Sequence, residues 1–375
     1  MPEPSLNIYS VLTILGAVQG IFLAFVLLTQ KRANPTSNRL LASLILVVVF
    51  SLGVVSLLLS KIFEPGIVLY PIATPLPILV GVLLYLYVKS VTIPDYNFTS
   101  KELIHFGWYL LHFLILVPFY FYSYDEQMDF IYQLYLGDPE QLERATVFFR
   151  VGIRFAYVIM SLRLIFKYRR LIKQAFSDVE EKQLTWLRNL IFAYFFLSPL
   201  VIAFRILDWH IEVMFLISIY LSVINYLIGF YFLKYQEIYS DVNEAIKKTI
   251  KYERSGLTKE KAEVLKEEVA NLVESKSIYT EPKLTAKDLA EKLQISTHIL
   301  SELLNEYFNQ NFYDFINSRR VEEAKKILSD IESQNMTVLA VAFEVGFNSK
   351  STFNSVFKKF TGMTPSQYKS SQAAA

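Results

Sequence analysis

The chain divides into two parts by its pattern of apolar and polar positions. Long apolar runs fill residues 1–233, whereas charged and polar residues alternate with short apolar groups in residues 234–375. A helix needs about 20 apolar residues to cross the roughly 30 Å hydrocarbon core of a bilayer. Seven runs reach or approach that length, and they cover residues 9–29, 40–60, 70–88, 105–122, 147–166, 189–207 and 213–233. The pattern therefore predicts an all-α chain in which a seven-helix transmembrane bundle precedes a soluble part.

Proline interrupts two of the predicted spans. Pro71, Pro75 and Pro77 fall in the third run, and Pro199 falls in the sixth. Because proline removes a backbone hydrogen bond and clashes with the preceding turn, both spans are expected to be kinked.

The positive charges between the runs predict the orientation of the bundle, because cytoplasmic loops carry an excess of lysine and arginine. One set of connections carries eleven such residues: Lys31, Arg32, Arg39, Lys89, Lys101, Lys167, Arg169, Arg170, Lys173, Lys182 and Arg188. The opposite set carries Lys61 and Arg144 alone, and its longest connection is acidic. This asymmetry predicts a multi-pass protein of the bacterial inner membrane, with the N-terminus outside and the C-terminal part in the cytoplasm.

The soluble part begins with a segment whose apolar residues recur at the spacing of an α-helix. Residues 234–256 carry an apolar stripe at Ile238, Val242, Ile246 and Ile250, which predicts a linker helix. This helix is either a solvated connector or a short dimer-forming coiled coil that relays a signal. A C-terminal domain is expected over residues 257–375, and it starts with an amphipathic helix from about 258 to 275.

Two similar patterns follow in this domain. Each has a short helix with a small residue, a tight turn and a second helix that begins at a polar cap, which is typical of a helix-turn-helix. They cover residues 284–309, with Ser296 as the cap, and 337–360, with Asn348 or Ser349 as the cap. Residues 312–328 predict one connecting helix of about 25 Å, which could hold two recognition helices near one DNA turn (about 34 Å) apart.

The residues at fixed places in these patterns indicate a family. The second pattern carries Val345-Gly346-Phe347, Ser351, Phe353, Phe357-Lys358-Lys359, Gly362, Thr364-Pro365 and Tyr368. The first carries Leu289-Ala290, Leu300-Ser301, Asn311-Phe312, Phe315-Ile316-Asn317 and Arg320-Val321. Together they resemble the DNA-binding domain of AraC/XylS-family transcriptional regulators, and the whole chain is similar to membrane-bound members of Bacteroidetes-like or Leptospira-like type. The resemblance implies sequence-specific control of transcription, with one recognition helix in each of two adjacent major grooves.

By position, the two recognition helices would offer eleven side chains to DNA: His298, Ser301, Glu302, Asn305, Lys350, Ser351, Thr352, Asn354, Ser355, Lys358 and Lys359. Asn and Ser can form hydrogen bonds with base edges, Glu302 could accept one from a cytosine amine, and Lys358 and Lys359 are better placed to bind phosphates. Many relatives carry arginine near positions 302 and 355, where this chain has Glu and Ser, so the base preference of this chain stays open.

The charge balance of the C-terminal domain bears on how tightly it binds DNA. Residues 257–375 hold fifteen Lys and Arg against sixteen Asp and Glu, which predicts weak, salt-sensitive binding that needs two copies of the chain.

Charged residues in or beside the spans suggest what the bundle senses, because intramembrane charge is costly. The candidates are Arg150, Arg154, Arg205, Asp208, His210 and Glu212, all expected near the outer ends of the last three spans. They either form an outward-facing pocket for an anionic signal ligand or pair with one another and with lipid headgroups. In the first case the ligand would shift the bundle between two arrangements, and the last span would pass the change to the DNA-binding domain.

Composition narrows the chemistry further. The chain has no cysteine, which excludes disulfides, thiolate metal sites and cysteine nucleophiles. No phosphate-binding glycine loop, metal-ligand cluster or nucleophile constellation is evident, so no enzyme activity, cofactor or metal is expected.

The expected partners are double-stranded DNA, membrane lipid, an unidentified signal ligand, a second copy of the chain and, for an activator, RNA polymerase. Two alternatives stay open: a membrane-anchored factor released by proteolysis near residues 252–258, and a transporter-like protein with a regulatory helix-turn-helix tail.

Overall fold

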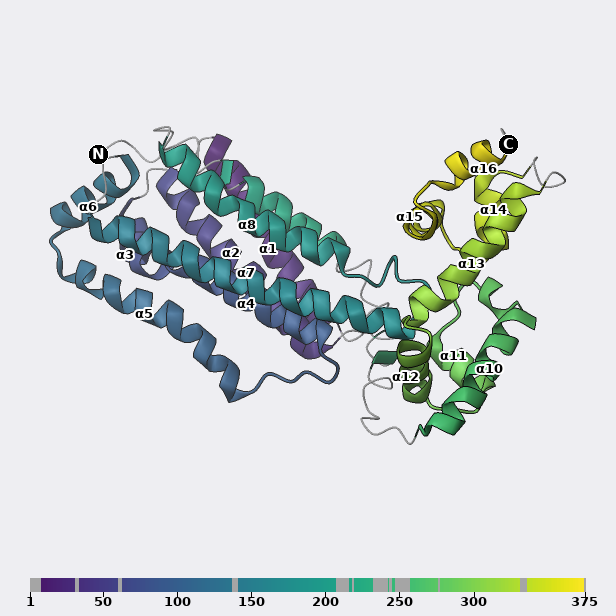
Figure 1. Ribbon diagram of the computed structural model, residues 1–375. Helices are drawn as coiled ribbons and strands as arrows, with labels where there is room; N and C mark the ends of the chain where they lie inside the picture. Colours follow the sequence, from purple (N-terminus) through teal and green to yellow (C-terminus); the bar gives the residue numbers. More distant parts are fainter. Residues whose placement is uncertain are drawn as a thin grey trace. The chain divides into compact units, whose positions relative to one another are not determined.

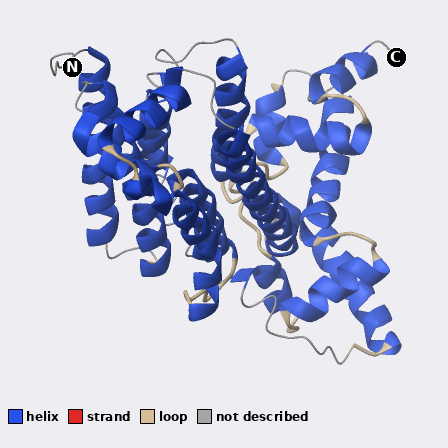
Figure 2. Cartoon of the chain, turned by 90° about the vertical axis from the view of Figure 1, so that its left-hand side faces the viewer, coloured by secondary structure: helices blue, strands red, loops and turns tan. Residues whose placement is uncertain are grey.

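The computed structural model describes residues 8–30, 34–59, 63–136, 141–206, 216–217, 219–231, 242, 245–246, 257–275, 277–330 and 336–373. Every named element in these ranges is a helix, and their only strand-like pairing is an isolated antiparallel bridge between Phe176 and Thr285 (Figure 2). The all-α class predicted from the sequence is thus confirmed for the described residues. The chain forms two compact units, Met1–Phe166 with Leu184–Ser240, and Lys167–Gln183 with Asp241–Ala375.

The first unit is built from apolar helices. Its elements are α1 (Ile8–Thr29), α2 (Pro35–Leu59), α3 (Phe63–Ala73), α4 (Leu76–Thr92), η1 (Ser100–Phe106), α5 (Gly107–Leu116), η2 (Val117–Phe121), α6 (Tyr124–Leu136), α7 (Gln141–Ala175) and α8 (Thr185–Ile206). A shorter apolar helix covers Ile219–Tyr231. The last turns of α7, from Lys167 onward, belong to the second unit.

Small residues and aromatic rings hold the first unit together. α1 packs along α2, as Figure 1 shows, and a Cβ added at Gly20 would lie only 2.4 Å from Cγ2 of Val49. Such close backbone approach is the usual packing of apolar helices in a membrane, where small residues line the contact. Elsewhere in the first unit, the hydroxyl oxygen of Tyr157 on α7 lies 2.8 Å from Nδ1 of His105 in η1.

Four stretches of the described residues are long and apolar enough to cross a membrane: Ser10–Thr29, Pro35–Val54, Val68–Thr92 and Ser100–Phe121. They fall on the first four predicted spans. The kink expected in the third span corresponds to the break between α3 and α4, whereas α8 continues through Pro199. The fifth predicted span lies within α7, the sixth follows α8 up to Ile206, and the seventh is described only in part. The acidic connection that follows the fourth span forms a helix, α6, which the sequence pattern did not predict.

The second unit carries the polar helices. Its elements are α10 (Lys259–Ser275), η3 (Ile278–Thr280), α11 (Ala286–Lys292), α12 (Thr297–Tyr307), α13 (Phe312–Ser329), α14 (Val338–Glu344), α15 (Lys350–Thr361) and α16 (Pro365–Ala373). Figure 1 shows α13 running between the pair α11–α12 and the pair α14–α15. Leu289, Leu304 and Phe315 are buried in the core around the first pair, and Phe353 and Phe357 are buried in the second pair. The predicted linker helix, 234–256, lies outside the described residues except for 242 and 245–246.

Candidate nucleic-acid interface

Residues of α14, α15 and the turn between them form the second helix-turn-helix. The hydroxyl of Ser349 accepts a hydrogen bond from the N–H of Thr352 and begins α15, so Ser349 is the cap rather than Asn348. In the turn, Gly346 has a φ of +93°, a left-handed conformation that favours glycine. The carbonyl oxygen of Thr280 lies 2.6 Å from the place that a Cβ on Gly346 would take, so the turn packs directly against η3.

The first helix-turn-helix repeats this construction. Thr285 and Asp288 form a reciprocal capping box at the start of α11. Ser296 accepts from the N–H of Ile299 at 3.2 Å and begins α12, as the sequence predicts. Each cap satisfies backbone donors that the first turn of a helix leaves unpaired. These local bonds fix where each recognition helix starts.

A buried arginine on α13 ties the two motifs together. Arg320 is 1% exposed, and its Nε donates to the carbonyl of Tyr279 at 2.6 Å. Nη2 donates to the carbonyl of Glu281 at 2.8 Å, Nη1 donates to Oδ1 of Asn317 at 3.2 Å, and the guanidinium lies over the ring of Phe347. Burial lowers the pKa of Arg320 to about 10, so the side chain stays charged at neutral pH.

The residues of α12 proposed to meet DNA are spaced along one helical face. Asn305 is exposed, and its amide donates to the carbonyl of Ser301 at 2.8 Å. Nδ1 of His298 lies 3.7 Å from Oε2 of Glu302, and both side chains are partly buried. Asn305 is therefore the most accessible of these four side chains.

The residues of α15 proposed to meet DNA are more open. Five of them are exposed, Lys350, Ser351, Ser355, Lys358 and Lys359, whereas Thr352 and Asn354 are partly buried. Nζ of Lys359 lies 2.6 Å from Oδ1 of Asp314 on α13, so this lysine is already paired inside the unit. Lys350 and Lys358 have no ion pair with any described residue, which leaves their charge available to a phosphate.

Comparison with known proteins agrees with this geometry. Residues 289–371 match a family model described as a helix-turn-helix domain, and this range contains α12, α13, α14 and α15. These residues form a helix-turn-helix domain of the AraC type.

The AraC-type domain is similar to parts of larger regulators. The chain is 33% identical over 91 residues to an uncharacterized HTH-type transcriptional regulator of Staphylococcus aureus, and 29% identical over 86 residues to the melibiose operon regulatory protein of Escherichia coli. These matches cover 24% and 23% of this chain but only 12% and 28% of the two relatives. The C-terminal domain of the two-component response regulator yesN from Fusobacterium nucleatum is 31% identical, with 28% of this chain and 98% of that one covered and a TM-score of 0.26.

An acidic segment that the sequence patterns did not single out reaches the AraC-type domain. The acidic segment, residues 177–180, follows α7 and belongs to the second unit. Glu180 accepts hydrogen bonds from the hydroxyls of Ser349, Ser351 and Thr352 at 2.5, 2.8 and 2.5 Å. Burial raises the pKa of Glu180, but these three hydrogen bonds outweigh it and hold the pKa below its ordinary value. Three acidic side chains, Asp178, Glu180 and Glu181, lie close together in a connection whose other charged residues are basic, and this cluster was the available signal.

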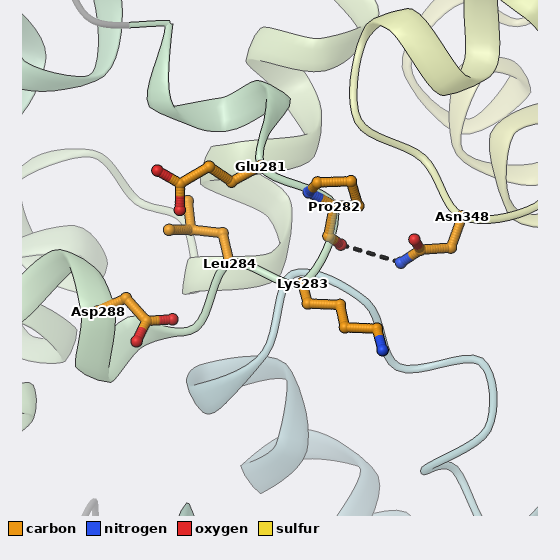
Figure 3. A pocket seen from close by; sticks show the side chains of 6 residues that line it. All are labelled: Glu281, Pro282, Lys283, Leu284, Asp288 and Asn348. Atoms are coloured by element: carbon orange, nitrogen blue, oxygen red, sulfur yellow. Dashed lines mark hydrogen bonds between the residues drawn. The ribbon is translucent and has the colours of Figure 1, made fainter.

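A surface hollow lies beside the start of α15. It is lined by Glu281, Pro282, Lys283, Leu284, Asp288 and Asn348. Figure 3 shows Asn348 pointing to the carbonyl of Pro282, to which its Nδ2 donates at 2.9 Å. The same Nδ2 donates to Oδ2 of Asp178 at 2.6 Å. Asn348 therefore joins the second helix-turn-helix both to the chain before α11 and to the acidic segment.

The ligand-binding residues predicted for the first unit are described only in part. Nη1 of Arg150 donates to the carbonyl of Thr74 at 3.0 Å, and Arg154 is partly buried on the same helix. Three of the candidates, Asp208, His210 and Glu212, lie outside the described residues, as does the side chain of Arg205. Within the described ranges, no group of three or more metal-ligating side chains comes together. The anion pocket stays a prediction.

Proposed function

We propose that this chain is a membrane-embedded, sequence-specific DNA-binding transcription regulator of the AraC type. The observation that carries the proposal is the presence of two capped helix-turn-helix motifs joined by one helix within a single unit. α13 has 18 residues and is therefore about 27 Å long, comparable to the roughly 34 Å between successive turns of the major groove. α12 and α15 would each enter one major groove on the same side of the duplex.

The side chains on these helices suggest separate roles in binding. Asn305 and Asn354 are proposed to read bases, because an asparagine amide can bond the N6 and N7 edge of adenine with two hydrogen bonds. Lys350 and Lys358 are proposed to bind phosphates, which position the protein without reading sequence. The remaining predicted contacts would lie around them: His298, Ser301, Glu302, Ser351, Thr352, Ser355 and Lys359.

The proposed orientation places the DNA-binding unit in the cytoplasm. The excess of lysine and arginine predicts that the connection between α7 and α8 is cytoplasmic. The acidic segment of that connection hydrogen-bonds to α15, so both must lie on the same side of any membrane. Two crossings between them, one in α8 and one that includes Ile219–Tyr231, would satisfy this condition. These relations support a seven-span, N-terminus-out arrangement in the inner membrane.

Signal coupling belongs to the same proposal. An external or membrane-borne ligand, with Arg150 and Arg154 on α7 as candidate anion-binding residues, would shift the helices of the first unit. α7 leads directly into the acidic segment, which gives the signal a covalent path to the DNA-binding unit.

The proposal is tested by selecting duplexes from a random-sequence DNA pool with the full-length chain in lipid nanodiscs. Selection is expected to enrich two half-sites about 10 base pairs apart, as two recognition helices in adjacent major grooves require. Asn305→Ala and Asn354→Ala should each relax the preference at one half-site and keep it at the other. Ser370→Ala, an exposed change on α16, should leave both half-sites intact. If no sequence is enriched by the wild type or by Glu180→Gln, which lacks the carboxylate that contacts α15, the regulator assignment fails.

A further inference from the structure

The acidic segment is fastened to both halves of the DNA-binding unit. Just before it, Phe176 pairs with Thr285 in an antiparallel bridge. The N–H and the hydroxyl of Ser177 both donate to the carbonyl of Leu284, at 3.3 and 2.6 Å, and the amide of Asn317 donates to the carbonyl of Ser177 at 3.0 Å. Ser177 is buried, so the segment is part of the packed unit rather than a loop lying on its surface.

At its other end, the segment places a carboxylate on the first turn of the second recognition helix. Both oxygens of Glu180 are used: Oε1 accepts from Ser351, and Oε2 accepts from Ser349 and Thr352. Two of these three donors, Ser351 and Thr352, are among the side chains expected to face DNA. The contact therefore covers part of the surface that the DNA-binding function needs.

The chemistry of this position suits a phosphate equally well. The unpaired N–H groups and the positive dipole end of a helix N-terminus attract anions, and hydroxyl groups add donors. Protein–DNA complexes use such helix N-termini for backbone phosphates. A carboxylate and a phosphate cannot both occupy one set of three hydroxyls, because each needs the same donors and their negative charges repel.

We propose that the Glu180 carboxylate and a DNA phosphate compete for one anion subsite formed by Ser349, Ser351 and Thr352 at the start of α15. The docked acidic segment holds the second helix-turn-helix in a DNA-free state, and release of the segment opens the subsite. This inference rests on the DNA-binding function proposed above. Because the segment lies between α7 and α8 in the chain, a signal that moves either helix acts on the docked segment directly.

Charge removal at Glu180 provides the first test, with the neighbouring glutamate as its control. Full-length wild type, Glu180→Gln and Glu181→Gln are placed in lipid nanodiscs, and their affinity for one selected duplex is measured over a series of salt concentrations. Glu180→Gln is expected to bind about tenfold more tightly, since charge-assisted hydrogen bonds that compete with DNA are lost. Its slope of log affinity against log salt should stay close to that of the wild type, because the same phosphate occupies the subsite in both complexes.

The side chain of Glu181 is exposed and makes no hydrogen bond or ion pair with the described residues. Glu181→Gln changes the net charge equally and should bind DNA like the wild type. Equal affinities for wild type and Glu180→Gln overturn the competition, while DNA binding itself stands. Failure of all three proteins to bind any selected duplex rejects the DNA-binding function instead.

A disulfide lock provides the second test, because the chain contains no cysteine of its own. Partners in an antiparallel bridge have Cα atoms roughly 4.5–5.5 Å apart, which is within the range of a disulfide. In the double variant Phe176→Cys/Thr285→Cys, the oxidised protein keeps the segment docked and should bind the duplex about tenfold more weakly than the same protein after reduction. Since both forms share one sequence, folding defects from the substitutions cancel. If oxidation closes the bond and leaves DNA affinity unchanged, the docked segment does not exclude DNA.

Discussion

Lys359 on the second recognition helix lies 2.6 Å from Asp314 on the connecting helix, Nζ to Oδ1. Lys358 beside it is exposed and makes no ion pair with a described residue. Lys358→Ala is therefore expected to weaken DNA binding and to flatten the salt dependence of log affinity by about one unit of slope, because one phosphate contact is lost. Lys359→Ala should change this slope less, since its charge is already engaged. Fluorescence anisotropy with a labelled duplex over a salt series measures both slopes. An equal decrease in slope for the two variants would show that the ion pair of Lys359 with Asp314 breaks when the protein binds DNA.

Gly346→Ala is expected to destabilise the second helix-turn-helix locally. A Cβ at this position would meet the carbonyl oxygen of Thr280 at 2.6 Å, and the backbone already has a φ of +93°. Gly362 provides a matched control, because its φ is +79° and nothing lies within 4 Å of its Cβ position. Gly362→Ala carries only the conformational cost of about 1–2 kcal/mol. Hydrogen–deuterium exchange over α14 and α15 in the full-length chain should show a larger loss of protection for Gly346→Ala, and equal losses would contradict the steric argument.

Features of the fold that depend on residues close together in the sequence could be predicted from the sequence. Ser296 and Ser349 start their helices because each hydroxyl caps an N–H three residues ahead, a relation visible in the sequence. α6 was missed because its acidic composition suggested a loop, although Ser123 and Glu126 form a reciprocal cap at its start. The contact between Glu180 and Ser351 could not be predicted, since 171 positions separate them and only the folded unit brings them together.

Arg320→Met is expected to destabilise the DNA-binding unit by about 2–5 kcal/mol, because two buried carbonyls lose a charged donor. Those carbonyls belong to Tyr279 and Glu281, in the segment that leads into α11. Arg320→Lys should restore part of the loss, since an ammonium keeps the charge but cannot reproduce the planar fork of donors. Hydrogen–deuterium exchange of η3 and α13 reports the change.

Arg319 is the control for this prediction. It is only partly buried, and its guanidinium contacts the ring of Phe315 at 5.3 Å. A cation–π contact of this kind contributes about 0.5–1 kcal/mol, so Arg319→Met should cost much less than Arg320→Met. A similar loss of protection in the two variants would mean that the hydrogen bonds of Arg320 do not hold the motifs together.

Membrane orientation can be read with single cysteines, because the chain has none of its own. In intact bacteria, a membrane-impermeant maleimide is expected to label Asp125→Cys on α6, which the charge asymmetry predicts to be outside. Glu181→Cys, beside the acidic segment, and Ser370→Cys on α16 should be labelled only after permeabilisation. The last two positions belong to one packed unit and must share a side. If all three give the predicted pattern, both the proposed orientation and the access of the DNA-binding unit to the chromosome are supported. If Glu181→Cys and Ser370→Cys differ from each other, the contact of Glu180 with α15 cannot exist in the membrane-inserted protein, and the proposed competition for the anion subsite fails with it.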